Sequence, residues 1–431
     1  MKVSNNIDNE SRDTTSSTIS DFKKFMDEVH RMNDKCVNGF GTPFEADSNE
    51  DYECKLRNRL DEFVKEIDKP AIKREGILPQ DIKIICEKVI SAFEAAKTGN
   101  LKESENVLAE ILEDYKKIPF AVSELDKNYA FRGIAPFGEL RQKWAPEEQY
   151  DTMLEGDLNF FRARIVKEDQ EIQERKDINY LPYSKQDLAQ DMRFSSRGKI
   201  CLYLGTTSYV CSRECRWDKK GKLYLASFKF NEKGKKLKIL NLVVTERLLN
   251  GLSALMETKK QMGELWKTLI RVFPLMIATA FTIRTSEERE HKYEYLLSQV
   301  LINVLQKVGI DGVAYLSRQG KNDLQYPQMV CLAIPVTDVD PENEYGSLIR
   351  NFSMTCPVLY DESFNDYKTD GKKSYINEKY PKDPEYPEFE SCKRDNTTAQ
   401  IEYDGKTVFY EDTVFSKLDN YLVNQVHEEI E

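Results

Sequence analysis

The chain has 431 residues, of which 40% are hydrophobic and 32% charged, a composition that excludes disorder throughout. Its length exceeds what one hydrophobic core usually organises, so two or three structural regions are expected. The formal net charge is −11 and no dense basic block offsets it, which disfavours nucleic acid and membrane surfaces as partners. A local basic pocket for a small phosphate-bearing ligand is still compatible with this charge.

The nine cysteines are scattered and form no CxxC pair, and no signal peptide precedes them, which indicates reduced thiols in a cytoplasmic protein. Cys211 and Cys215 stand four residues apart, but with only three histidines in the chain no zinc-binding spacing results. We therefore expect no metal. The most apolar run, residues 272–281, is too short to cross a bilayer and contains Pro274, so it predicts a buried helix.

The first part of the chain predicts helices. Residues 1–18 have almost no apolar content and predict a disordered tail. Apolar residues then recur at helical spacing, with Gly and Pro between the later segments, and predict a helical N-terminal domain over residues 19–150. Its charged faces are interpreted as solvated surface rather than as a groove for a partner.

From about residue 160, short β-rich runs replace the helical repeats, so the middle of the chain is expected to be α/β. The runs are FFRARIV, KICLYLG, LYLASFKF, LKILNLVV, GVAYLS and QMVCLAIP. Two helical stretches, residues 244–273 and 291–309, interrupt them. Further on, residues 361–395 predict a long irregular surface segment, and residues 413–430 predict a last helix.

Three segments of this middle region concentrate side chains that suit a phosphate-bearing, sugar-linked ligand. Arg162 and Arg164 alternate along the first β-run, so both are expected to project toward one face. The other two segments are an arginine-containing loop with the strand and helix after it, and the GVAYLS strand. The candidate residues from all three are Arg162, Arg164, Arg193, Ser195, Arg197, Tyr203, Glu214 and Ser317.

Each candidate also has an ordinary structural interpretation. An arginine on a strand is usually a surface cation, and a tyrosine in a strand usually serves packing. Glu214 is compatible with an exposed helix carboxylate paired with Arg216 or Lys219. Ser317 is compatible with a residue that ends a strand before a turn. For isolated residues these interpretations are the default.

The order of the segments resembles the RES-domain family, which is named for Arg, Glu and Ser residues and is found in bacterial toxins that consume NAD. The resemblance covers about residues 158–336, through FFRARI, RFSSRG, CLYLG, Glu214, YLLSQ and GVAYLS. Arg193 precedes Tyr203 by ten residues and Tyr203 precedes Glu214 by eleven, as in the family. The loop departs from the family, which carries an Arg-Trp-Asn-like turn where this chain has Arg-Phe-Ser-Ser.

The resemblance implies an α/β (α+β) fold in which a mixed-sheet domain like that of ADP-ribosyltransferases follows the helical domain. That domain would span residues 156–336 and bind NAD as its substrate, and residues 337–431 would form a C-terminal extension. The implied function is a toxin or defence effector that cleaves the nicotinamide N-glycosidic bond and transfers ADP-ribose to water or inorganic phosphate. Transfer to a protein acceptor, or a non-catalytic NAD-binding or interaction protein, are the alternatives.

Because such an enzyme would harm its own cell, we expect restraint, either by an antitoxin or regulatory protein, as the resemblance implies, or by the N-terminal domain covering the cleft. Homo-oligomerisation is left open. The resemblance assigns Arg193, Tyr203, Glu214 and Ser317 as catalytic candidates. The NAD-binding candidates are Arg162, Arg164, Ser195 and Arg197.

These residue types suit the chemistry. The reaction passes through an oxocarbenium-like ribose, whose positive charge the Glu214 carboxylate would stabilise. Arg193 and Arg162 are the preferred ligands of the pyrophosphate, because a guanidinium binds phosphate oxygens through paired hydrogen bonds. Tyr203 offers an aromatic face and a hydroxyl. Ser317 would position the ribose or carboxamide and is not expected to be a nucleophile, since no His or Lys base is evident.

Overall fold

The computed structural model describes residues 34–132, 158–255, 260–283, 292–319, 328–338, 344–367, 400–403 and 405–430. The tail predicted for residues 1–18 lies outside the described residues, and so does the domain boundary predicted between residues 150 and 156. Most of the segment predicted to be irregular, residues 361–395, lies outside them as well.

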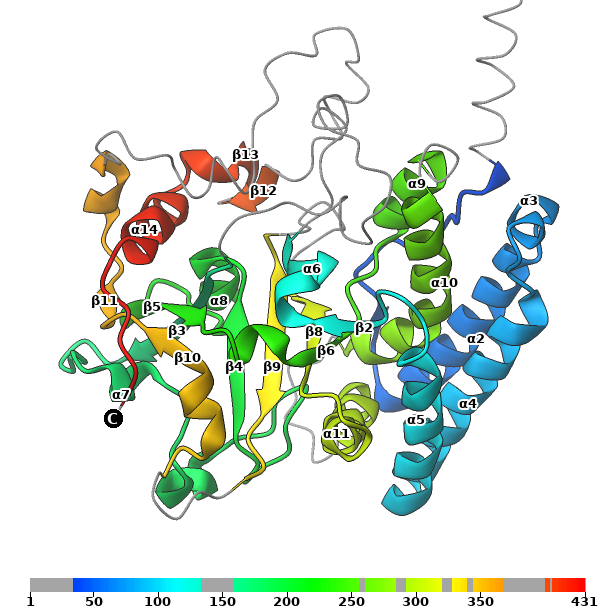
Figure 1. The fold of residues 1–431 in the computed structure, drawn as a ribbon, viewed down its shortest axis with the longest axis horizontal. Helices are drawn as coiled ribbons and strands as arrows, with labels where there is room; N and C mark the ends of the chain where they lie inside the picture. Colours follow the sequence, from blue (N-terminus) through cyan, green and yellow to red (C-terminus); the bar gives the residue numbers. More distant parts are fainter. Residues whose placement is uncertain are drawn as a thin grey trace, which may run out of the picture.

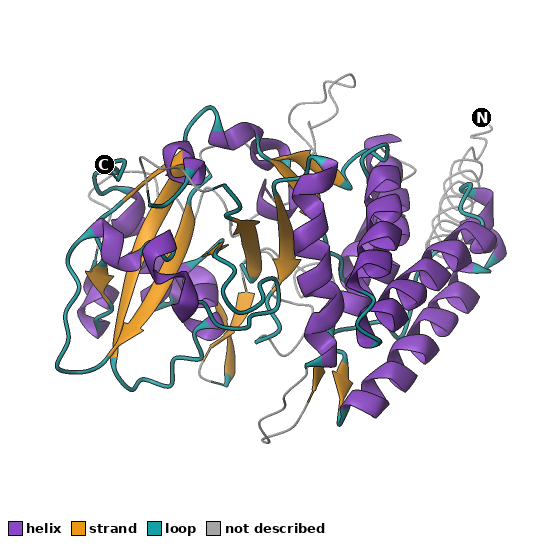
Figure 2. Ribbon diagram, turned by 90° about the horizontal axis from the view of Figure 1, so that it is seen from below, coloured by secondary structure: helices purple, strands orange, loops and turns teal. Residues whose placement is uncertain are grey.

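The described residues form an α/β fold, which confirms the predicted class. Helices gather on one side of the molecule and a mixed sheet on the other (Figures 1 and 2). The helices of the first side are α2 (Asn49–Ile67), α3 (Pro70–Arg74), α4 (Pro79–Lys97), α5 (Leu101–Tyr115), α9 (Glu246–Leu255) and α10 (Lys260–Ala280).

Helix α2 shows how the sequence specifies this layer. Ser48 is its N-cap, and the Ser48 hydroxyl accepts a hydrogen bond from the Asp51 backbone N–H at 3.1 Å. Apolar residues three or four apart then form one buried stripe, which includes Tyr52, Leu60 and Phe63. The helix is therefore stable because this stripe is covered by other helices.

The N-terminal helices pack against α10, which comes from the middle of the chain. The Tyr52 hydroxyl of α2 donates to the Ala278 carbonyl at 3.1 Å, and the rings of Phe63 and Phe273 lie 4.7 Å apart. From α5, the Tyr115 hydroxyl donates to a carbonyl of α10 at 2.8 Å. The region predicted as a helical domain thus shares one continuous core with helices from the middle region.

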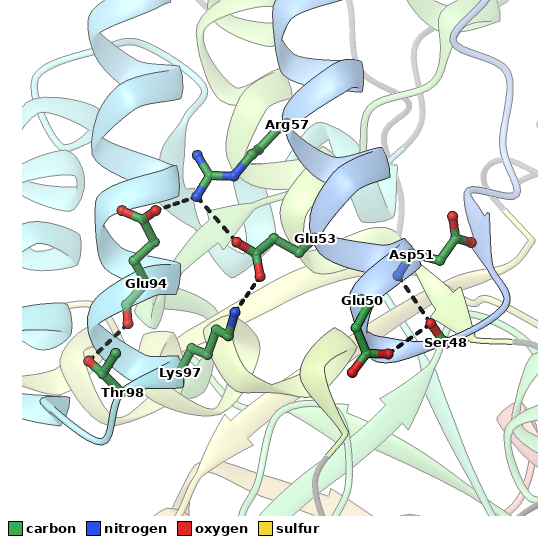
Figure 3. Close-up of polar contacts among 8 residues, drawn as sticks. All are labelled: Ser48, Glu50, Asp51, Glu53, Arg57, Glu94, Lys97 and Thr98. Atoms are coloured by element: carbon green, nitrogen blue, oxygen red, sulfur yellow. Dashed lines mark hydrogen bonds and ion pairs between the residues drawn. The ribbon is translucent and has the colours of Figure 1, made fainter.

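Charged side chains also link α2 to α4, as Figure 3 shows. Lys97 forms an ion pair with Glu53 at 2.5 Å, and Arg57 contacts both Glu53 and Glu94. Exposed pairs of this kind contribute about 0–1 kcal/mol each. The apolar contacts beneath them therefore decide how these helices pack.

The sheet has the strand order β10-β5-β3-β4-β9-β8-β6-β2, with β11 also paired to β5. Its neighbours are antiparallel except for β6 and β8, which are parallel. The strands are β2 (Val122–Glu124), β3 (Phe160–Val166), β4 (Cys201–Gly205), β5 (Lys222–Phe230), β6 (Lys238–Asn241), β8 (Gly312–Leu316), β9 (Val330–Pro335), β10 (Phe352–Met354) and β11 (Val358–Leu359).

The six strands predicted from β-rich runs are confirmed as β3, β4, β5, β6, β8 and β9. The edge strands β2, β10 and β11 were not predicted, because two or three residues are too few to display alternation. β2 comes from the N-terminal half and pairs with β6, whereas β10 and β11 come from the C-terminal part and pair with β5. All three predicted regions of the chain therefore contribute to one sheet.

Five further helices and two strand pairs complete the described fold. The predicted last helix is α14, which ends earlier than expected, and the apolar run with Pro274 is a buried part of α10, as predicted. The remaining elements are α6 (Tyr129–Arg132), α7 (Arg175–Ile178), α8 (Ser208–Glu214), α11 (Tyr293–Leu305), α14 (Val414–Val423), the pair β1 (Glu45–Ala46) and β7 (Thr282–Ile283), and the pair β12 (Gln400–Tyr403) and β13 (Lys406–Phe409).

Helix α11 lies between the helical layer and the sheet, because it contacts α4 and α5 on one side and β8 on the other. It continues into a short 3-10 turn and stops at Gly309, whose φ of +73° is left-handed. Among the described helices, none is both long enough and apolar enough to cross a membrane.

The shared core predicts cooperative unfolding. Phe63→Ala should lower the free energy of unfolding by about 3–5 kcal/mol, because a fully buried ring is replaced by a cavity. Urea unfolding followed by circular dichroism should show one transition, shifted as a whole. Ile84→Ala, on the exposed side of α4, is the control and should change stability by less than about 0.5 kcal/mol. Two separate transitions, with only one shifted, would contradict the shared core.

Candidate active site

Tyr203, the predicted site residue of β4, lies on the same face of the sheet as Tyr315 of β8. Tyr203 is opposite Ala333 of β9, and Ala333 is opposite Val313 of β8, so the three side chains point the same way. Tyr315 is two residues beyond Val313 and shares that face by strand alternation. We call this side of the sheet the tyrosine face.

Helix α8 lies beside β4 (Figure 1), and it packs on the tyrosine face because β4 ends in a glycine. Gly205 is two residues from Tyr203, and a Cβ placed on it would lie 2.3 Å from Val210 and 2.7 Å from the Cys211 sulfur. Only glycine permits this close approach of the helix. Since α8 ends at Glu214, the packing places that carboxylate over the tyrosine face.

The Glu214 carboxylate meets Ser317, which directly follows β8. The Ser317 hydroxyl donates a hydrogen bond to Glu214 and accepts one from the Gln319 backbone N–H at 3.2 Å. The Ser317 backbone N–H donates to the Met329 carbonyl at 2.8 Å, which fixes Ser317 at the end of the sheet. Two predicted catalytic residues that are 103 positions apart in the sequence are therefore in contact.

Burial raises the pKa of Glu214 above its ordinary value of 4.5. The Ser317 hydrogen bond and the positive charges of Arg193, Arg318 and Arg216 act in the opposite direction. Glu214 is thus a half-buried carboxylate that lies near three arginines. It is not the exposed, ion-paired side chain of the ordinary interpretation.

Tyr203 is joined to the arginine-containing loop, since its hydroxyl donates to the buried Ser195 hydroxyl at 3.0 Å. Burial holds the pKa of Tyr203 well above 10, so the hydroxyl stays neutral and able to donate. Burial also raises the pKa of Tyr315, and the neighbouring Cys331 and Glu214 add to this effect. Tyr315 thus lies close enough to Glu214 for the carboxylate charge to raise the pKa of the tyrosine.

Residues 191–198, which we call the arginine loop, are tied to two helices. Arg193 donates to the Thr279 carbonyl at 2.8 Å and to the Phe281 carbonyl at 3.0 Å, at the C-terminal end of α10. A cation is favourable there because unpaired carbonyls give a helix end partial negative charge. Arg193 also reaches the Glu294 carbonyl of α11 at 3.4 Å. The predicted pyrophosphate ligand is therefore also the anchor of its own loop.

Two residues of α11 that the sequence did not single out hold the same loop. The Arg193 guanidinium carbon lies 5.0 Å from the centroid of the Tyr295 ring, a cation–π contact. One turn later, the Gln299 amide donates to the carbonyls of Met192 at 3.1 Å and Ser195 at 3.4 Å. Both residues belong to the YLLSQ segment. Their spacing of four residues on a predicted helix places them on one face, and this spacing is the sequence feature that could have identified them.

Arg162 and Arg164 project to the same side, as predicted, and both meet the chain around α7. Arg162 donates to the carbonyls of Ile178 at 2.8 Å and Tyr203 at 2.9 Å, and Arg164 donates to the Asp177 carbonyl. β3 and β4 are paired at a single position, and Arg162 bridges them beyond it. Burial lowers the pKa of Arg162 below its ordinary value, because the cation is poorly solvated there.

Arg197 lies apart from the other candidates. Its guanidinium is exposed and 4.0 Å from the Asp191 carboxylate, to which its backbone N–H also donates at 2.9 Å. Cys211 and Cys215 direct their sulfurs to carbonyls of β3 at 3.0 and 3.7 Å. Within the described ranges, no three His, Cys, Asp or Glu side chains gather in a way that would hold a metal ion.

The fold is thus α/β, and its candidate site holds a half-buried glutamate in contact with a buried serine beside arginines. The chain is similar to the protein named "Putative toxin YopC" of Bacillus subtilis (strain 168). The two are 23% identical over 331 residues, which cover 69% of this chain and 73% of that protein. No family model matches the chain, and no solved structure does. The chain thus has a distant toxin-like relative, and membership of the RES-domain family stays a prediction.

The Glu214–Ser317 contact can be tested without any substrate. Ser317→Ala should raise the pKa of Glu214 further, because the hydrogen bond that favours the charged form is lost while the burial remains. Titration by carbon NMR of labelled glutamate side chains measures this pKa. Ser184→Ala removes a hydroxyl that donates to the exposed Glu344 and serves as the control. An unchanged Glu214 titration in Ser317→Ala would contradict the contact.

Proposed function

We propose that this protein cleaves the nicotinamide–ribose bond of NAD and transfers ADP-ribose to water or to inorganic phosphate. The observation that carries the proposal is the contact between Glu214 and Ser317, with the Arg193 charge and the Tyr203 hydroxyl positioned around the same face. These four residues come from separate segments of the chain. They lie on the arginine loop, on β4, at the end of α8 and directly after β8.

The proposed reaction needs a carboxylate and no general acid. The C–N bond breaks with its electron pair passing to the nicotinamide ring, which leaves neutral from a cationic pyridinium. The ribose develops oxocarbenium character, and the anionic Glu214 stabilises this charge most strongly where water is largely excluded. Water then adds and loses a proton, or a phosphate oxygen adds, to the same carbon. The Ser317 hydroxyl keeps Glu214 oriented and anionic.

Arginine placement supports a phosphate-bearing substrate. Arg162 is a half-buried cation whose observed hydrogen bonds go to neutral carbonyls, so its charge is available to an anion. Arg193 lies near enough to Glu214 to lower the pKa of that carboxyl. A substrate with a pyrophosphate beside a cationic ring would satisfy both signs of charge. Such an activity would harm a cell, which agrees with the name of the distant relative.

The proposal predicts nicotinamide release from NAD by the purified protein. Chromatography should show ADP-ribose as the second product in water, and a phosphorylated ADP-ribose when inorganic phosphate is present. Radiolabel that ends on protein would instead indicate ADP-ribosylation of an acceptor. Glu214→Gln should lower kcat by about 10²–10³-fold, because one preorganised charge is removed from the site.

Glu232→Gln is the matched control, since this exposed glutamate lies on the surface beside Lys235. It should keep the wild-type kcat. NAD that stays intact with folded wild-type protein would contradict the proposed function, and so would equal activity in wild type and Glu214→Gln.

The raised pKa of Glu214 predicts how activity depends on pH. Because the proposed role needs the anion, kcat/KM for NAD should fall as the pH drops through the pKa of Glu214, and this acid limb should lie above 4.5. In Ser317→Ala the limb should move to higher pH, since the pKa rises again. A pH–rate profile of both proteins measures the shift. Superimposed acid limbs would show that another group controls the profile.

A further inference from the structure

A carboxylate is fully buried in the C-terminal part of the chain, outside the segment that carries the family resemblance. Asp419 lies in the middle of α14, and none of its surface is exposed. Burying a carboxylate costs free energy unless hydrogen bonds or charges compensate it. The groups that surround Asp419 therefore indicate what this residue does.

Asp419 accepts hydrogen bonds from the start of α8 and from Tyr410. The Ser208 backbone N–H lies 3.1 Å from one carboxylate oxygen and 3.4 Å from the other. The Tyr410 hydroxyl donates to the second oxygen at 2.7 Å. The Ser208 hydroxyl in turn donates to the Phe415 carbonyl of α14 at 3.3 Å. The backbone N–H and the hydroxyl of Ser208 are thus both held by the described chain that follows β9, which we call the C-terminal segment.

These contacts stabilise α8 at the end opposite Glu214. Ser208 is the first helical residue, and its N–H is one of those that a helix cannot satisfy internally. A negative charge at this end also complements the helix dipole. Thr207 satisfies another of these donors, as its hydroxyl accepts from the Val210 N–H at 3.1 Å. The two caps together fix where a helix of seven residues begins.

Aromatic packing strengthens the same junction. Tyr209 of α8 lies 5.5 Å from the ring of Phe415 and 6.0 Å from that of Tyr403. Phe415 also packs on Tyr360, at 4.9 Å. α8 is therefore clamped between the tyrosine face, which Gly205 lets it approach, and the C-terminal segment.

We propose that Asp419 is a positioning residue for Glu214: by holding the first turn of α8, it sets the place of the carboxylate at the helix's last residue. The inference rests on the proposed function, because it assumes that Glu214 acts on the substrate. On this proposal the C-terminal segment contributes to the geometry of the candidate site. A short helix transmits a shift of its first turn directly to its last, and a misplacement of about 1 Å can cost about 100-fold in rate.

The test is Asp419→Asn, which removes the negative charge and replaces one of the two acceptor oxygens by an NH2 group that can only donate. We expect kcat for NAD to fall about 10- to 100-fold, while KM changes little because the arginines are untouched. Hydrogen exchange should become faster at the amides of residues 208–214. Asp366→Asn, an exposed aspartate of the same segment, is the control and should match wild type in both measurements.

A double variant separates positioning from a general loss of structure. If Asp419 acts through Glu214, adding Asp419→Asn to Glu214→Gln should lower kcat little further, because both changes remove the same effect. Fully multiplied effects would overturn the proposal. Tyr410→Phe deletes one hydrogen bond to Asp419 without adding a group, and it should show a smaller change of the same kind. It decides the matter if Asp419→Asn fails to fold.

The outcomes keep the two proposals apart. Unchanged exchange in α8, or a wild-type kcat in Asp419→Asn, would overturn the positioning role. A wild-type protein that leaves NAD intact would overturn the proposed function instead, and exchange in α8 would still report whether Asp419 holds the helix. Faster exchange spread evenly over the whole chain would also count against a local role.

Discussion

The apolar packing of α11 is the contact on which the candidate site depends. One side of the helix buries leucines such as Leu297 and Leu301 among the N-terminal helices and β8. Its remaining surface carries Tyr295 and Gln299 to the arginine loop. The same helix thus satisfies the hydrophobic core and positions a loop, so a change in how it packs would also move Arg193.

Because they pack against α10 and α11, the N-terminal helices are part of the same core as the candidate site. A separate domain covering a cleft was one expected means of restraint, yet the described helices α2, α4 and α5 share the core of α10 and α11. Removing residues 1–150 would expose that core and take away the edge strand β2. Restraint by this region is better tested by surface substitutions than by deletion.

The candidate site places charges of both signs close together under partial burial. Glu214 has a raised pKa because it is desolvated, and the nearby arginines and Ser317 reduce that cost. Arg162 is a cation, so desolvation has the opposite effect on it and lowers its pKa. A neutral ligand would gain little from such a pair of environments. A ligand with a pyrophosphate and a cationic ring would satisfy both, which is the physical basis of the proposal for NAD.

Sequence alone determined the strands and helices with strong periodicity, because local spacing carries that information, and the family resemblance selected Glu214, Ser317 and Tyr203 as candidates. It missed β2 and β10, whose few residues show no pattern. Only the tertiary structure decided that Glu214 touches Ser317, that α11 holds the arginine loop, and that Asp419 caps α8. These contacts join residues about 100 to 210 positions apart. No local pattern encodes such pairs, because they depend on how buried surfaces fit together.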